Sequence, residues 1–266
     1  MALDASGRGR ARGRGGEPGV KLTVIGSSGT YPTPTNACSG YLFSSEGFNL
    51  QVDCGPGTFV EGQEYCSVEE LDAVILTHWH PDHCTDIYPL FYALRFHPDS
   101  PARLPVYAPA GAERHLFAFL SGDSREEFQR VFDFRVIDEA SELEAGPFKL
   151  RFARTHHPVE TLAVSVQEGA HRIVYSSDTG PDGGYPGLAA GADICICEST
   201  YEYAGQGPPI HLSAGEAGSI AANAGVGRLC LAHIFPTVDA RRCVGEASEA
   251  FGEEVGCVVQ GDRIEL

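Results

Sequence analysis

The 266-residue sequence predicts an α/β fold in which helices cover layers of β-sheet, and three observations lead to it. Short apolar runs typical of strands recur along the chain, and they fall into two groups. Stretches with helical periodicity follow the strands of each group. Hydrophobic residues make up 42% of the chain, which is enough to bury a sizeable core. Strands and helices in this alternation favour a layered α/β domain.

Each predicted strand is a short apolar run that ends at turn residues. Early runs follow one another through short turns such as Ser45-Glu-Gly47, which indicates antiparallel hairpins. The predicted strands are Val20–Ile25, Gly40–Ser44, Phe48–Asp53, Ala73–Thr77, Pro105–Ala108, Phe148–Ala153, Leu162–Gln167, Arg172–Ser176, Asp193–Cys197, Arg228–Ala232 and Cys257–Gln260.

The predicted helices are four stretches that lie between these strands. One of them opens with Ser213-x-x-Glu216, a capping box, and its apolar positions repeat at helical spacing. The predicted helices are Asp86–Phe96, Gly111–Leu120, Ala214–Ala224 and Ala240–Phe251.

The charge of the chain is strongly acidic, with 19 Lys and Arg against 36 Asp and Glu, a net charge of −17. Such a surface repels nucleic acids and anionic membranes. No run approaches the roughly 20 apolar residues that a membrane span needs. We therefore expect neither a membrane nor a nucleic acid as a partner.

The first 19 residues differ from the rest in composition, because Arg alternates there with small residues. We predict a disordered Gly/Arg-rich tail at residues 1–19, with a nucleic-acid-binding arm as the alternative. The tail has no apolar segment of the kind found in secretory signals. No linker divides residues 20–266, which we expect to form a single domain.

The chain has nine cysteines and no C-x-x-C pair, so a cysteine-based metal site is not expected. Cys195 and Cys197 alternate within an apolar run and should share one face of a strand. Buried, reduced thiols of this kind indicate a cytoplasmic protein.

The segment Thr77-His78-Trp79-His80-Pro81-Asp82-His83 contains four candidate metal ligands. Histidine and carboxylate are ligands that Zn²⁺, or a similar divalent ion, takes in hydrolytic sites. A regular strand would point His78 and His80 to one face. Pro81 is expected to break the strand, so that Asp82 and His83 turn toward a second point. The spacing therefore fits two neighbouring metals better than one, and a His-rich solvated loop is the alternative.

Further candidate ligands follow three later predicted strands. They are His156 or His157, in a His-His-Pro segment, then Asp178, and then His233. Each lies just past an apolar run, where the functional sites of layered α/β folds gather. Singly, each is typical of a turn, whereas together with the first cluster they indicate one metal centre.

These segments, in this order, resemble the motifs of the metallo-β-lactamase-fold hydrolases. Asp53-Cys-Gly-Pro-Gly57 is similar to the first motif of that fold, and the histidine segment that follows Thr77 is similar to its second. The resemblance runs from about Val20 to the C-terminus. It implies a four-layer αββα sandwich and a single hydrolase domain over residues 20–266.

Three features resemble the branch that holds ribonuclease Z and the cyclic-nucleotide phosphodiesterases. Asp178 stands where the β-lactam hydrolases usually carry a cysteine. Glu198-Ser-Thr-Tyr201 is similar to the "HEAT" segment of ribonuclease Z, with Cys197 in place of its first histidine. His211-Leu-Ser213 resembles the His-x-Ser/Thr of the same branch.

The resemblance also implies how the ligands divide between two divalent metal ions, with Zn²⁺ expected and Mn²⁺ or Fe²⁺ as alternatives. His157 is preferred to His156 because the family's ligand directly precedes Pro-Val, and exchange of these two is the alternative. Asp53 would orient a ligand histidine. The implied ligands are His78, His80 and His157 for the first metal, Asp82, His83 and His233 for the second, and Asp178 as the bridge between them.

The implied reaction begins with a hydroxide shared by the two metals, which attacks phosphorus. Asp82 is the candidate to accept the proton of the water. His211 is the candidate to donate a proton to the leaving alkoxide, with Glu198 orienting it and keeping it protonated.

The substrate expected from these features is a small anion. Ribonuclease Z carries its tRNA-gripping arm between the residues that match His157 and Asp178, and this chain has only 21 residues for that connection. The C-terminal part also resembles small actinobacterial-type hydrolases linked to cyclic AMP breakdown. We therefore expect a phosphodiesterase for a small cyclic phosphodiester such as cyclic AMP. The alternatives are an acyl (thioester or lactone) hydrolase of a biosynthetic pathway and a ribonuclease Z-like tRNA 3′ endonuclease. The resemblance also implies a homodimer.

Overall fold

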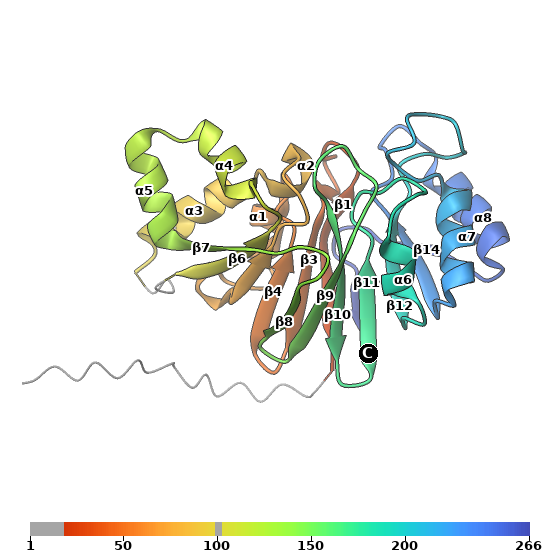
Figure 1. Ribbon diagram of the computed structural model, residues 1–266, viewed down its shortest axis with the longest axis horizontal. Helices are drawn as coiled ribbons and strands as arrows, with labels where there is room; N and C mark the ends of the chain where they lie inside the picture. Colours follow the sequence, from red (N-terminus) through yellow and green to blue (C-terminus); the bar gives the residue numbers. More distant parts are fainter. Residues whose placement is uncertain (1–18, 99–102) are drawn as a thin grey trace, which may run out of the picture.

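Two facing β-sheets with helices on their outer sides form a four-layer αββα sandwich in the computed structural model (Figure 1). The structure describes residues 19–98 and 103–266. The predicted α/β class and the four layers are confirmed. The tail predicted at residues 1–19 lies outside the described residues except for Gly19.

The first sheet is antiparallel on one side and parallel on the other. The predicted hairpin at Ser45-Glu-Gly47 joins two antiparallel strands, and the strands from Phe48 onward pair in parallel. In spatial order the strands are β15 (Arg263–Glu265), β1 (Lys21–Ser28), β3 (Gly40–Ser45), β4 (Phe48–Val52), β5 (Ala73–Ile75), β6 (Leu104–Ala108) and β7 (Phe132–Val136), and β2 (Ala37–Cys38) pairs with β1.

The second sheet repeats this plan, with antiparallel strands followed by parallel ones. Its strand β9 shows why the sequence forms a strand here: Phe148, Leu150 and Phe152 are buried, whereas Lys149 and Arg151 between them are exposed. In spatial order the strands are β14 (Gly256–Cys257), β13 (Arg228–Ala232), β12 (Ile194–Glu198), β11 (His171–Tyr175), β10 (Leu162–Glu168), β9 (Phe148–Arg154) and β8 (Glu142–Ala145).

The helices form the two outer layers. Those of the first half pack on the first sheet, and those of the second half pack on the second sheet (Figure 1). The capping box predicted at Ser213 and Glu216 is present. The first outer layer holds α1 (Thr58–Gly62), η1 (Val68–Glu70), α2 (Pro81–Cys84), α3 (Ile87–Phe96), α4 (Ala112–Leu116), η2 (Phe117–Phe119) and α5 (Gly122–Val131), and the second holds α6 (Tyr185–Ala189), α7 (Ala214–Ala224) and α8 (Ala240–Phe251).

Three apolar clusters bind the four layers together. The central cluster fills the space between the sheets and includes the rings of Tyr41 and Tyr175, which are tilted by 47° with centroids 4.5 Å apart. The other two lie between each sheet and its helices, and Cys195 and Cys197 share the one under α7. All nine cysteines are free, as predicted. In the part of the chain that the structure describes, no helix has the length and apolar character that crossing a bilayer requires.

Several element predictions differ from the structure. The strand expected at Ala73–Thr77 ends at Ile75, and Pro81 opens helix α2 where a strand break was expected, since proline is well suited to the first turn of a helix. The stretch Gly111–Leu120 divides into α4 and η2. Helices α1, α2, α5 and α6 and strands β2, β7, β8 and β15 were not predicted.

Candidate metal centre

The candidate ligands lie at one edge of the sandwich, where strands of both sheets end near α2 (Figure 1). His78 and His80 follow β5, and Asp82 and His83 lie on α2. The other candidates each come directly or shortly after a strand: His157 after β9, Asp178 after β11 and His233 after β13. Because both sheets end here, segments that are far apart in the sequence converge.

The first ligand group consists of His78, His80, His157 and Asp178. His157 Nε2 lies 2.9 Å from His80 Nδ1 and 3.8 Å from Asp178 Oδ2. His78 Nε2 lies 3.8 Å from the same carboxylate oxygen. These are the residues that the sequence assigned to the first metal and its bridge.

The second ligand group consists of Asp82, His83, His233 and Asp178. His83 Nε2 lies 3.1 Å from Asp178 Oδ1. His233 Nε2 lies 3.3 Å from Asp82 Oδ2 and 3.5 Å from Asp178 Oδ1. Asp178 thus turns one oxygen to each group, which is the arrangement that a bridging carboxylate requires.

The donor atoms in both groups fit divalent cations. His78 Nε2 and Asp178 Oδ1 are buried and have no hydrogen-bond partner among the described residues, although buried polar atoms are normally paired. His83 Nε2 lies 3.1 Å from Asp178 Oδ1, as an ion pair. A cation between the imidazoles and the shared carboxylate would satisfy both atoms. Histidine with carboxylate is a donor set that Zn²⁺, Mn²⁺ and Fe²⁺ accept.

The electrostatics of the site suit these roles. Burial lowers the pKa of His78, His80 and His157, so these imidazoles are neutral, as metal ligands must be. Burial also acts to lower the pKa of His83 and of His233, but the charge of Asp178 outweighs it and raises both, so these two imidazoles would release a proton when a cation binds. Burial acts to raise the pKa of Asp82, but the charge of His83 and a hydrogen bond from His233 outweigh it and lower the pKa to about 2. An ionised Asp82 suits a ligand but is a weak base, so its role as proton acceptor stays a prediction.

Asp53, which follows β4, is buried beneath the ligands and orients two of them. Its Oδ2 lies 2.7 Å from His83 Nδ1 and accepts a hydrogen bond from the Thr77 hydroxyl at 3.0 Å. The same hydroxyl lies 3.1 Å from His78 Nδ1, so the carboxylate reaches one ligand directly and another through Thr77. Tyr175 donates to Asp53 Oδ2 at 3.4 Å from the other sheet. Partners of this kind fix the tautomer and direction of a ligand histidine.

His211 and Glu198 form a pair beside both ligand groups. Glu198 is the last residue of β12 and is fully buried, and its Oε1 lies 2.9 Å from His211 Nδ1. Burial acts to lower the pKa of His211, but the charge and hydrogen bond of Glu198 outweigh it and raise the pKa to about 9. The imidazole ring of His211 stacks on that of His233, with centroids 5.6 Å apart.

The backbone at the site is strained in a way that supports function. Asp53, Ser177 and His233 have φ values of 63°, 53° and 54°, which are unusual for residues other than glycine. Such conformations gather at sites where the surrounding structure holds a side chain in place. A Cβ on Gly55 would lie 2.1 Å from the carbonyl oxygen of Asp82, so only glycine allows this loop to approach α2 so closely.

The structure separates His156 from His157, the two alternatives for one ligand, and adds Thr200 to the site. His156 is half-exposed and 3.9 Å from Asp182, whereas its neighbour His157 lies in the first ligand group. Thr200, which sequence reasoning did not single out, connects the two halves of the site. Its hydroxyl donates to Glu198 Oε2 at 2.8 Å and lies 2.9 Å from His233 Nδ1. Its only sequence signal is its place two residues after Glu198.

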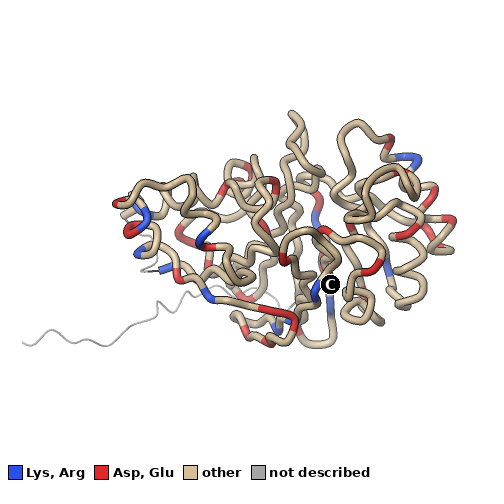
Figure 2. The backbone as a smooth tube through the Cα atoms, turned by 45° about the horizontal axis from the view of Figure 1, so that its top comes forward, with Lys and Arg blue, Asp and Glu red and all other residues tan. Residues whose placement is uncertain are grey.

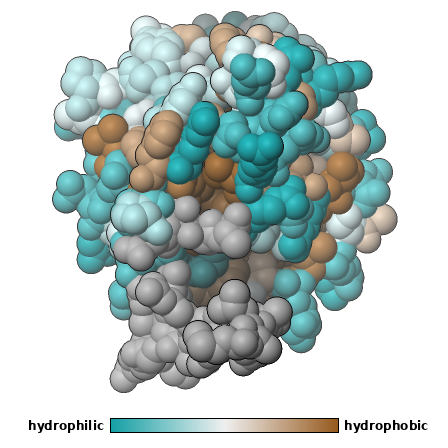
Figure 3. All heavy atoms as spheres, turned by 90° about the vertical axis from the view of Figure 1, so that its left-hand side faces the viewer, coloured by the Kyte–Doolittle hydropathy of each residue, from teal (hydrophilic) through white to brown (hydrophobic). Residues whose placement is uncertain are grey.

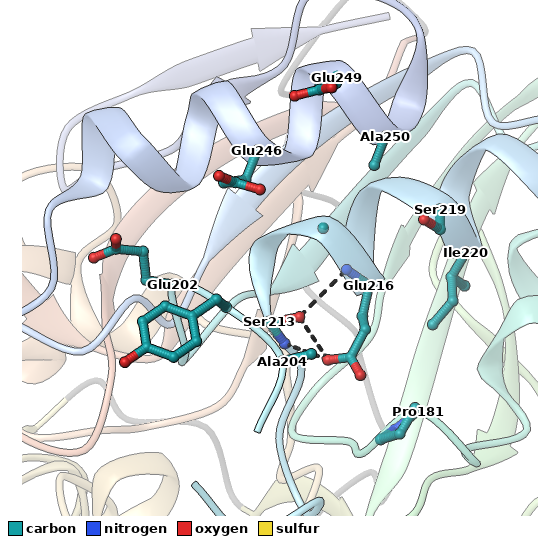
Figure 4. Close-up of a pocket in the computed structure, with 12 residues that line it drawn as sticks. Pro181, Glu202, Ala204, Ser213, Glu216, Ser219, Ile220, Glu246, Glu249 and Ala250 are labelled. Carbon is teal, nitrogen blue, oxygen red and sulfur yellow. Dashed lines mark hydrogen bonds between the residues drawn. The ribbon is translucent and has the colours of Figure 1, made fainter. Parts of the chain in front are cut away.

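A groove lies next to segments that follow the site residues Asp178 and His211 in the chain. It has a volume of about 590 Å³ and runs between α7, α8 and the loop after β12 (Figure 4). Its wall includes Pro181, three residues past Asp178, and Ser213, two residues past His211. Four glutamates also line it, namely Glu202, Glu216, Glu246 and Glu249. The metal ligands lie outside its wall, and its negative charge disfavours an anion there.

Comparisons with known proteins agree with this geometry. Residues 49–234 match the family model described as the beta-lactamase superfamily domain. The probable metallo-hydrolase YhfI of Bacillus subtilis is 34% identical over 253 residues, which cover 91% of this chain and 98% of YhfI. The crystal structure of YhfI matches with a TM-score of 0.82, over 93% of this chain and all of that one. A ribonuclease Z of Halorubrum lacusprofundi is 28% identical, in a match that covers 93% of this chain and 97% of that ribonuclease.

An αββα sandwich with two joined histidine and carboxylate groups at the strand ends defines the metallo-β-lactamase-fold class of metal-dependent hydrolases. The chain belongs to the beta-lactamase superfamily. The connection from His157 to Asp178 is the hairpin of β10 and β11, so the arm of ribonuclease Z is missing, as predicted.

Proposed function

We propose that this hydrolase cleaves a small cyclic phosphodiester, such as cyclic AMP, at a dinuclear metal centre. The observation that carries the proposal is the pairing of His211 with Glu198 at 2.9 Å, directly beside both ligand groups. Cleavage of a phosphodiester releases an alkoxide that needs a proton, and this pair can supply one.

The two ligand groups would hold one divalent ion each, with Asp178 shared between them. When bound, such ions supply Lewis-acid activation of water and stabilisation of charge on the phosphoryl oxygens. The contribution of the chain is to fix the ligand directions, through Asp53 and Thr77 on one side and Thr200 on the other. Zn²⁺ is the ion that we expect, and Mn²⁺ and Fe²⁺ share the same donor preference.

His211 is the proton donor in this proposal. Its Nδ1 is engaged by Glu198, so Nε2 is the nitrogen left to donate to the leaving oxygen. With a pKa of about 9, the imidazole carries its proton at neutral pH. Glu198 Oε1 also accepts a hydrogen bond from the backbone N–H of Thr179 at 2.6 Å. Because Thr179 follows Asp178 in the chain, Glu198 keeps the proton donor at a fixed position relative to Asp178.

Charge and size favour a small anion over a nucleic acid. Lys and Arg are scattered among acidic residues in the described part of the chain and form no continuous track (Figure 2). The acidic groove beside His211 would repel a polyanion on that side. A small phosphodiester needs only the positive charge of the bound ions.

A hydrolysis screen with defined metals would test the proposal. The purified chain, loaded with Zn²⁺ or Mn²⁺, is given 3′,5′-cyclic AMP, bis-p-nitrophenyl phosphate, a precursor tRNA and an acyl thioester. We expect hydrolysis of the two small phosphodiesters. Cleavage of the thioester alone would establish the acyl hydrolase, cleavage of the tRNA alone would establish the ribonuclease Z-like activity, and either result would overturn the proposal.

The homodimer that the resemblance implies stays a prediction. The face over the first helical layer mixes apolar and hydrophilic side chains (Figure 3). Phe96 at the end of α3 and Phe119 in η2 are 71% and 82% exposed and are the side chains that we expect in such an interface. Sedimentation equilibrium would decide whether the chain is a dimer in solution.

A further inference from the structure

A smaller cavity than the acidic groove is lined by the chain neighbours of His233. It has a volume of about 160 Å³ and lies between the loop that follows β1 and the loop that follows β13. Ala232 and Ile234, the neighbours of His233 in the chain, are both part of its wall. The cavity therefore lies next to the backbone that carries His233, a residue of the second ligand group.

The two loops are fixed to the backbone of His233. The His233 N–H donates to the carbonyl oxygen of Ser27 at 2.8 Å, and the Gly29 N–H donates to that of Ile234 at 3.2 Å. A Cβ on Gly29 would lie 2.6 Å from the carbonyl oxygen of His233, so the contact requires glycine. The cavity is thus held at a constant position relative to a metal ligand.

The walls of the cavity suit a flat, partly polar ring. Phe235, Val238 and Val259 give it apolar surface, and Ser28, Thr33 and Asn36 give it polar groups. The ring of Tyr31, which is 42% exposed, meets that of the lining residue Phe235 edge to face at 5.8 Å. Aromatic and aliphatic walls with a few polar groups are typical of small-molecule sites.

We propose that this cavity binds the nucleobase of the cyclic phosphodiester while its phosphate lies at the metal centre, an inference that rests on the proposed function. The volume supports a single ring system, because pockets for drug-sized ligands begin at about 300 Å³. A polynucleotide would extend beyond it. The apolar walls contact the faces of the base, and the Asn36 amide, with one N–H donated to Ser27 Oγ at 3.2 Å, has a second N–H for the edge of the base.

The test is a substitution that fills the cavity from its exposed rim. Val259 lines the cavity and is 45% exposed, so Val259→Trp adds bulk there with little risk to the core. The matched control is Val136→Trp, at a valine that is 71% exposed on β7, the strand at the far edge of the first sheet. The ratio of kcat/KM for cyclic AMP to kcat/KM for bis-p-nitrophenyl phosphate, which has no base, is measured for each protein.

We expect Val259→Trp to lower this ratio about tenfold or more, mainly through a higher KM for cyclic AMP, and Val136→Trp to leave it unchanged. An unchanged ratio in Val259→Trp would overturn the proposal.

Saturation-transfer NMR with adenosine, on the metal-loaded protein, separates this inference from the proposed function. Wild type should give a signal that Val259→Trp loses and Val136→Trp keeps, even if no phosphodiester is cleaved. Hydrolysis of phosphodiesters without any adenosine signal would refute the base site and leave the proposed function standing.

Discussion

Thr200→Val should weaken the second metal site without unfolding the protein. The substitution keeps the shape of the side chain but removes the hydroxyl that lies 2.9 Å from His233 Nδ1 and donates to Glu198 at 2.8 Å. Thr200 is 2% exposed, so water does not replace it easily. Leaving a buried N–H of this kind unpaired costs about 1–3 kcal/mol. Loss of such a partner typically weakens metal binding about 10- to 100-fold, which equals about 1.4–2.8 kcal/mol.

The free-energy cost of the unpaired N–H and the typical loss of metal-binding free energy fall in the same range. We therefore expect one of the two metal ions to bind about 10- to 100-fold more weakly in Thr200→Val. Competition titration with a chromogenic chelator measures both dissociation constants. Circular dichroism at increasing temperature, with the metals removed, checks that the fold is retained. The same variant should also shift the pH profile of kcat, because Thr200 supports the Glu198 carboxylate that pairs with His211.

Thr200→Ser is the matched control, since serine restores the hydroxyl. It should recover both the metal affinity and the pH profile. If Thr200→Val binds two ions with wild-type affinity and keeps the wild-type profile, then the hydroxyl does not orient His233 and the reasoning is refuted.

The remaining predictions concern the proton donor, the metals and the thiols. His211→Ala should lower kcat for phosphodiester hydrolysis about 100-fold. The control His171→Ala, at the exposed start of β11, should keep the wild-type kcat. Equal kcat values for the two variants would exclude His211 as the proton donor. Chelation should abolish hydrolysis and lower the Tm, because removal of the metals leaves the buried His78 imidazole unpaired. Added Zn²⁺ should restore both the activity and the Tm. Full activity of the chelated protein would contradict a metal mechanism. Burial raises the pKa of Cys84 to about 12 and of Cys257 to about 11, so iodoacetamide at pH 8 should modify them slowly until the protein is unfolded, as mass spectrometry would record.

The elements predicted correctly are those whose side chains carry a clear period. Strand β9 alternates buried and exposed residues, and the apolar positions of α7 repeat at helical spacing behind a capping box. Helix α5 was missed because Phe128 is its only buried residue, so its sequence has no apolar stripe. Helix α2 has four residues, which is too short for any helical period to appear.

The candidate ligands could be named from the sequence because they lie in one histidine-rich segment or follow apolar strands, and the ends of neighbouring strands meet in space. The positions of the strands do not show that Asp178 turns one oxygen to each ligand group, because this depends on the direction of each carboxylate oxygen. Thr77 and Thr200 were not identified as site residues because their roles also depend on the folded structure. Threonine is common beside strand ends, and only the fold brings these two against His78 and His233.

The net charge of −17 is compatible with an anionic substrate because the acidic residues are divided between two places. Asp53, Asp82 and Asp178 lie within the metal centre, where two divalent ions would more than balance their three negative charges. Glu198 is neutralised by the protonated His211. The centre would therefore be positive while the groove and surface around it stay negative. Because screening limits these fields to about 10 Å, a small anion that enters the centre is attracted, whereas a long polyanion must also cover the negative surroundings. The same charge distribution thus selects for substrate size, and raising the salt concentration should reduce the discrimination against longer phosphodiesters.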